Sequence, residues 1–391
     1  MKKYNKKINI LFFIGITLIE IRFFLNISQI FNVNSHILDI VLLFAYLFLV
    51  LKILLANEKI KNLIFYFFIL ILGVGVYYKT SQPSVVTLFL VVISAKNIEI
   101  KKIVKYLLIL NSINLAIHVC LYIIYYVFQL DALKIVLRRV NGKVIQRYSF
   151  FIGHPNTFSA FFFWTFMMYL YVYYEKIDAK TYLYIILSMI YIYIYPNSKT
   201  TVIGFAIALI LISRKYDTER SKKFFFKIIK ILPVFACIFS LVSIVFFDNR
   251  IIQIIDKLFT GRIMVARGLY EYYGVHLFGS NISEHAIFFF INNKQINNIN
   301  SVDGSYYSML INSGIIGLIL YAVFIQQSFN RLIKAEKIKE IIFLSICIIF
   351  GLLETSCINP LLAFPLLFIN KMYEKEEKED ESKGIYNYTN L

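Results

Sequence analysis

Long apolar runs separated by short polar stretches dominate the chain from one end to the other. A run of about 20 apolar residues can cross a bilayer as a helix, and a lipid-buried backbone must satisfy its own polar groups. The pattern predicts about 12 spans, with 11 to 13 compatible, at 8–27, 36–56, 62–78, 83–96, 103–129, 155–175, 180–195, 199–213, 228–247, 305–325, 338–356 and 359–372. We therefore expect an all-α polytopic membrane protein, with one membrane domain over 1–373 and a charged tail over 374–391.

Composition and charge fit this class. The 391 residues are 59% hydrophobic and 16% charged, and the net charge is +18. In a soluble chain that charge would suggest nucleic acid, but 28 of the 41 Lys and Arg fall in or beside segments on the same side as the N-terminus. The positive-inside rule then places both termini in the cytoplasm, and the charge needs no nucleic acid to explain it.

The N-terminus and the cysteines add little further chemistry. Residues 1–7 are basic and precede an apolar run, as in a signal peptide, but no small-residue cleavage site follows, so we expect an uncleaved first helix. The four cysteines show no metal-binding spacing and are expected to pack as small apolar residues. Phosphate-binding loops and Asp-x-Asp signatures are absent from the sequence, so it predicts neither a metal nor a cofactor.

Two expected external segments, 130–154 and 248–304, are longer than a turn. The first has a net charge of +4, from Lys134, Arg138, Arg139, Lys143 and Arg147 against Asp131. External segments are normally poor in Lys and Arg, so this excess indicates either an anionic ligand or contact with lipid phosphates.

The stretch from Arg147 to Asn156 carries the most informative polar residues. Gly153-His154-Pro155-Asn156 opens the predicted span at 155. Pro155 suits the first helical position, which leaves His154 to cap the helix. Capping explains the proline but gives no role to Arg147 upstream.

The second segment predicts two helices, an amphipathic one over 249–259 and another from Gly261-Arg262 to Tyr273. On the latter, Arg262 and Arg267 project about 140° apart at 100° per residue. They cannot easily serve one site from an unbroken helix, and we favour Arg262.

Three further polar residues lie at the ends of predicted spans. Asp303 either caps the helix beginning at 305 or acts chemically. Lys199, in the turn 196–200, either extends its ammonium toward lipid headgroups or binds a ligand. Glu354 lies deep enough that it should pair with a cation or take part in catalysis.

In this order, these residues resemble the superfamily of bacterial polysaccharide polymerases and O-antigen ligases, and most of all the Wzy-type capsular repeat-unit polymerases. The resemblance covers about 60–370. It rests on Arg147, Gly153-His154-Pro155-Asn156, Ser198-Lys199-Thr200, Gly261-Arg262, Leu277-Phe278-Gly279, Val302-Asp303-Gly304-Ser305-Tyr306, Gly314-Ile315-Ile316-Gly317 and Glu354. The chain departs from the family at two positions: related ligases carry a histidine in place of Asp303, and the family's turn residue is commonly arginine where Lys199 stands.

The resemblance implies a GT-C-like membrane enzyme in the plasma membrane of a bacterium, with a Gram-positive source favoured. It would polymerise undecaprenyl-diphosphate-linked repeat units at the outer face without a metal, alongside a flippase and a chain-length regulator. Arg147, Arg262 and Lys199 would bind the diphosphate, with the two arginines converging from different loops. Asp303 is the first candidate for the base and His154 the second. Four residues take secondary roles: Asn156, Arg267, Tyr306 and Glu354.

Three other functions stay open. A ligase would transfer glycan from the same donor to a different acceptor. A flippase for lipid-linked oligosaccharide would more often carry its charges inside the spans and show two related halves. A membrane scaffold is also possible, but it gives no reason for clustered external cations.

Overall fold

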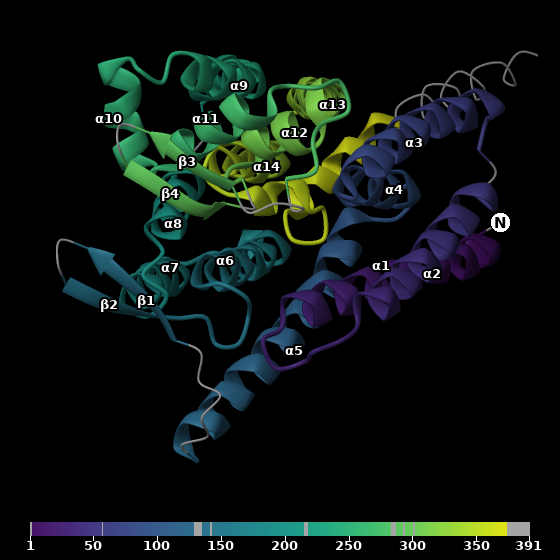
Figure 1. Ribbon diagram of the computed structural model, residues 1–391. Coiled ribbons are helices and arrows are strands. Elements are labelled where there is room, and N and C mark those ends of the chain that lie inside the picture. Colours follow the sequence, from purple (N-terminus) through teal and green to yellow (C-terminus); the bar gives the residue numbers. More distant parts are fainter. Residues whose placement is uncertain are drawn as a thin grey trace, which may run out of the picture.

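The computed structural model describes residues 2–56, 58–128, 135–140, 143–214, 218–282, 287–291, 294–299 and 302–373. The described chain is mainly helical, and Figure 1 shows the helices from α6 onward gathered beside the long helices of the N-terminal part. The expected tail at 374–391 lies outside the described residues.

The N-terminal part consists of five helices: α1 (Lys2–Ile27), α2 (Ser35–Leu54), α3 (Ile60–Thr80), α4 (Ser84–Ser94) and α5 (Ile100–Val127). Helices α1 and α2 approach each other closely at Gly15, where an added Cβ would meet the Leu49 side chain at 2.6 Å. Helix α4 is short, and most of its side chains are buried. The first five predicted spans are thus helices in the structure.

The central part contains α6 (Pro155–Val172), a 3₁₀ turn η1 (Tyr174–Lys176), α7 (Ala179–Ile194), α8 (Lys199–Ser213) and α9 (Glu219–Val245). The C-terminal part contains α10 (Arg250–Leu258), α11 (Arg262–Tyr273), α12 (Ser305–Asn312), α13 (Gly314–Lys334), α14 (Ile338–Gly351), η2 (Thr355–Ile358) and η3 (Phe364–Tyr373). Helices α10 and α11 confirm the two predicted for the second external segment.

Six of the described helices are long and apolar enough to cross a membrane: Lys7–Ile27, Ser35–Leu54, Ile60–Thr80, Ile100–Val127, Glu219–Val245 and Gly314–Lys334. Shorter apolar helices are Ser84–Ser94, Ala179–Ile194 and Lys199–Ser213. This set is compatible with a multi-pass membrane protein.

Two features depart from a purely helical prediction. Antiparallel hairpins lie within the expected external segments, β1 (Ile135–Val140) with β2 (Lys143–Tyr148) and β3 (Ile287–Ile291) with β4 (Lys294–Ile299). The segment expected as a last span at 359–372 begins with turns and continues as the 3₁₀ helix η3 instead of an α-helix. Pro360 and Pro365 lack the N–H that an α-helix needs, which disfavours an α-helix there.

The predicted span 305–325 is interrupted between α12 and α13. Gly314 has a φ of 73°, and an added Cβ there would collide with the backbone of Gly279 and with the His276 carbonyl at 2.5 Å. The loop through Gly279 crosses so close that only glycine fits. The break makes α12 a separate short helix whose N-terminal end reaches the candidate site.

Candidate functional site

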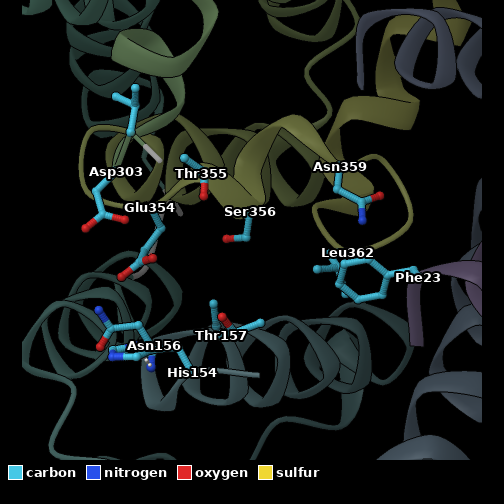
Figure 2. Close-up of a pocket in the computed structure, with 12 residues that line it drawn as sticks. Phe23, His154, Asn156, Thr157, Asp303, Glu354, Thr355, Ser356, Asn359 and Leu362 are labelled. Atoms are coloured by element: carbon cyan, nitrogen blue, oxygen red, sulfur yellow. Dashed lines mark hydrogen bonds between the residues drawn. The ribbon is translucent and has the colours of Figure 1, made fainter. Parts of the chain in front are cut away.

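A cavity of about 500 Å³ separates the start of α6 from the segment that follows α14. Its lining comprises Phe23, His154, Asn156, Thr157, Ala160, Val302, Asp303, Glu354, Thr355, Ser356, Asn359 and Leu362. Figure 2 shows the Asp303 and Glu354 carboxylates at one end, with Phe23 and Asn359 at the other. Four parts of the chain, α1, the start of α6, the residues before α12 and the residues after α14, therefore contribute to one cavity.

A buried ion pair lies beside the acidic end of this cavity. Arg262, the first residue of α11, donates from Nη2 to Glu354 Oε1 at 2.8 Å, and its Nε lies 3.6 Å from Asp303 Oδ2. Arg262 and Glu354 are both buried, whereas the Asp303 side chain is 48% exposed. The expected pairing of Glu354 with a cation is confirmed, and Arg262 is that cation.

The two carboxylates of this cluster stabilise the charge of the buried Arg262 guanidinium. Burial alone would lower the pKa of Arg262, but the carboxylates of Glu354 and Asp303 outweigh it and raise that pKa above its usual value. The guanidinium therefore stays cationic. Its buried Nη1 makes no hydrogen bond within the described chain, so this nitrogen of the guanidinium is not used in the cluster.

The N-terminus of α6 forms the opposite wall. His154 caps the helix by accepting a hydrogen bond at Nδ1 from the Asn156 N–H, 3.3 Å away, and Pro155 occupies the first turn. Both local predictions are confirmed. Because Nδ1 accepts, a neutral His154 ring carries its proton on Nε2.

Arg147 supports this wall through a hydrogen bond to Asn156, on the side away from the cavity. Its Nη2 donates to Asn156 Oδ1 at 2.6 Å and its Nε to the Pro196 carbonyl at 2.8 Å. The neighbouring Tyr148 N–H donates to the Tyr195 carbonyl at 3.2 Å, so β2 is fastened to the turn between α7 and α8. Arg147 is buried and reaches the cavity through Asn156.

The start of α8 contributes a different residue from the one expected. Lys199 is exposed and does not line the cavity, whereas the neighbouring Thr200 is buried. Thr200 Oγ1 donates to Glu354 Oε1 at 2.6 Å, and Arg262 Nη2 lies 3.4 Å from the same hydroxyl. Thr200 therefore completes the buried cluster, and no Lys or Arg appears among the described residues of the cavity lining.

Of the two alternatives predicted for Asp303, the capping of α12 is wrong. Gly304 occupies the N-cap position with a φ of 89° and no side-chain hydrogen bond. An added Cβ at Gly304 would meet the Leu352 carbonyl at 3.0 Å, so the chain passes too close for another residue. Asp303 lies one residue before the cap, and its carboxylate faces the cavity beside Arg262 (Figure 2).

Two secondary candidates lie outside the cavity lining. Arg267 pairs with Glu271 at 2.7 Å and donates to the carbonyls of Ile244 and Val245, so it ties α11 to the end of α9. Arg262 and Arg267 thus serve different places, as their helical angle predicts. Tyr306 is buried against the Tyr321 ring, with ring centroids 5.8 Å apart.

Sequence reasoning missed much of the uncharged lining. Thr157, Thr355, Ser356 and Phe23 carry no local motif, and Asn359 stands out only because a proline follows it. Trp164 supports this wall from α6 by donating from Nε1 to Ser356 Oγ at 3.1 Å. Hydroxyls, amides, carboxylates and an aromatic ring together suit a polyhydroxylated ligand, since such groups can donate to and accept from hydroxyls.

Within the described residues, no three His, Cys, Asp or Glu gather where they could hold a metal ion. Comparison with family models, with curated proteins and with solved structures gives no match to the chain.

Proposed function

We propose that this protein is an integral membrane glycosyltransferase that joins saccharides carried on a lipid diphosphate. The specific form we propose is a repeat-unit polymerase that extends a bacterial surface polysaccharide on undecaprenyl diphosphate at the outer face of the plasma membrane. The single observation that carries the proposal is the cavity, where polar side chains from four distant segments converge within an apolar helical protein. Polar groups among membrane helices are costly, and they usually mark function.

The lining supports a saccharide as the ligand. Asn156, Asn359, Thr157 and Ser356 offer neutral hydrogen-bonding groups along the walls, and Phe23 offers an apolar surface at one end. A volume of about 500 Å³ lies within the range of small-molecule sites, so one or two sugar rings can enter.

Asp303 is our candidate for the general base. A base must reach the acceptor hydroxyl, and Asp303 is the more accessible of the two cavity carboxylates. Glu354 accepts hydrogen bonds from both Arg262 and Thr200, which engages its Oε1. In this scheme Asp303 accepts the hydroxyl proton as the acceptor oxygen attacks the anomeric carbon and the lipid diphosphate leaves with the bonding electrons.

Stabilisation of the leaving diphosphate falls to the α6 wall. The positive end of its helix dipole lies at the cavity and favours an anion there, although Pro155 has no N–H and the Asn156 N–H is used by the His154 cap. The resting contacts revise the expected arginine clamp, because Arg147 and Arg262 are both buried behind cavity residues. We propose that Arg147 positions Asn156, and that Arg262 acts on substrate through Asp303 and Glu354.

The test is polymer synthesis by purified protein supplied with a lipid diphosphate-linked repeat unit. Asp303→Asn should abolish chain growth, and the matched control Asp248→Asn, at an exposed aspartate of the same external segment, should not. A deletion strain should accumulate lipid bearing one repeat. Full-length polymer without its final acceptor would indicate a ligase, and normal elongation by Asp303→Asn would remove the proposed base.

A further inference from the structure

Helix α10 presents an apolar strip to the outside of the protein. It begins just after α9, one of the helices able to cross a membrane, with Asn249 as its N-cap. Ile251, Ile254 and Leu258 are 66%, 52% and 66% exposed. Their spacing of three and four residues places them along one side of the helix.

The charged residues of α10 also lie on particular sides of the helix. At 100° per residue, Arg250 and Lys257 fall beside the apolar strip, and both are exposed. The acidic residue of the helix, Asp256, is buried on the opposite side. The outward half of α10 is therefore apolar and cationic, with no negative charge. Such a helix lies flat in a membrane interface, with its apolar side in the acyl boundary and its cations at anionic headgroups.

The buried side of α10 is attached to the candidate site. Asp256 Oδ1 accepts from the N–H groups of Ile263 at 2.8 Å and Met264 at 3.2 Å, which are among the first of α11. The Asp256 carbonyl also accepts from the Gly261 N–H at 2.9 Å. These bonds fix the first turn of α11, where Arg262 begins the helix and pairs with Glu354.

We propose that α10 is an interfacial helix that binds the anionic headgroup layer of the bilayer crossed by α9, and that Asp256 transmits its position to Arg262. The continuity of α10 with α9 and its purely cationic polar edge identify the lipid surface as its partner. The inference rests on a membrane location, which the proposed function shares, but it requires no saccharide chemistry. The lipid-exposure measurements can therefore fail or succeed independently of enzyme activity, and only the link to Arg262 is read from polymer synthesis.

The single tryptophan of the chain makes a direct measurement possible. Trp164→Phe gives a background without tryptophan, and Ile254→Trp then reports from the apolar strip of the full-length protein. In phosphatidylglycerol vesicles containing brominated acyl chains, this variant should lose most of its emission and should be poorly quenched by aqueous iodide. Strong quenching by iodide with little effect of bromine would overturn the proposal. Ile252→Trp on the inward side is the control, and it should be shielded from both quenchers.

A second measurement retains Trp164 and guards against a misfolded background. A spin label on Ile254→Cys, in protein lacking its four cysteines, should collide more readily with oxygen than with a water-soluble nickel chelate.

The link to the site is tested by Asp256→Ala, which removes the acceptor for the α11 N–H groups. Lipid exposure at 254 should persist in this variant while polymer synthesis falls. Unchanged synthesis would refute transmission to Arg262.

Discussion

Glu354 and Glu20 are both buried carboxylates in an apolar helical protein, but their surroundings differ. Glu354 receives hydrogen bonds from Arg262 and Thr200 and lies beside the cavity. Glu20, in α1, is only 1% exposed, and neither of its oxygens has a hydrogen-bond partner in the described chain. An isolated charge is far costlier to bury than a neutral acid, so Glu354 can remain ionised whereas Glu20 is favoured as the neutral acid. The same residue type therefore has a cationic partner at one place and no hydrogen-bond partner among the described residues at the other.

Other polar side chains in and just after α1 do find hydrogen-bond partners, so the lack of partners at Glu20 does not come from a wholly apolar environment. On the same helix, Thr17 Oγ1 lies 2.7 Å from the Tyr106 hydroxyl. Just after the helix, Ser28 Oγ lies 3.0 Å from His118 Nε2. Each of these pairs joins α1, or the residue just after it, to α5 through neutral groups. A cation such as Arg262 allows the ionised form at Glu354, and no such contact is formed by Glu20 in the described chain. Glutamine should therefore destabilise the protein strongly at position 354 and change its stability little at position 20.

The largest effect is expected for Glu354→Gln. The substitution leaves Arg262 buried with only the more distant Asp303 as a counter-charge, and breaking a buried pair typically costs about 3–5 kcal/mol. The melting temperature of the detergent-purified protein should fall markedly. Replacing both partners, as Arg262→Met with Glu354→Met, should recover much of that loss because no buried charge is left alone. A single variant as stable as the parent would show that the pair adds nothing to the fold.

Asp303→Asn should separate chemistry from stability. Asp303 is half-exposed, lies 3.6 Å from Arg262 and does not cap α12, so its loss should change stability little. Asparagine cannot accept a proton at neutral pH, and loss of a general base typically lowers the rate by about 10²-fold or more. Single-turnover chain extension with lipid-linked repeat measures this loss. An asparagine variant that is both unstable and inactive would instead assign Asp303 to the structural cluster with Glu354.

Arg147→Lys should have an intermediate effect on stability. Lysine keeps the charge but cannot reproduce two directed bonds to the Pro196 carbonyl and Asn156 Oδ1. Leaving a buried acceptor without its donor costs about 1–3 kcal/mol. Thermal unfolding should report this loss, and polymer yield should fall with it as Asn156 loses its support. Lys199→Ala, at an exposed cation near the same turn, is the control and should leave both readings near the parent's.

Local sequence signals predicted the local features of the site. The proline after His154 indicated its capping role, and helical angle separated Arg262 from Arg267. Features set by tertiary approach escaped prediction. The charge of Lys199 made it the candidate in the sequence, whereas Thr200 makes the buried hydrogen bond to Glu354. Aspartate is a common cap, but the closeness of the Leu352 carbonyl gives the position to Gly304.

The global features divide in the same way. Apolar runs predicted most helices, because hydrophobic length is a local property. The break at Gly314 depends on which segments cross one another, which residue spacing does not encode. The hairpins join strands adjacent in sequence, and Asn141-Gly142 between β1 and β2 is a strong hairpin signal that the apolar pattern alone does not reveal. Glu20 attracted no prediction because a single acid in an apolar run carries no motif. Its lack of described partners becomes evident only when the surrounding helices are in place.

The smallest effect is expected for Glu20→Gln. If Glu20 is held as a neutral acid, a neutral amide of nearly the same shape changes neither charge nor packing, and the free energy of unfolding should shift by less than about 1 kcal/mol. The melting temperature at neutral pH should therefore stay close to that of the parent, in contrast to Glu354→Gln. Glu20→Leu sharpens the comparison, since removing a buried polar group without partners should be neutral or stabilising. A Glu20→Gln protein as unstable as Glu354→Gln would mean that Glu20 is ionised and paired, and the distinction between the two carboxylates would fail.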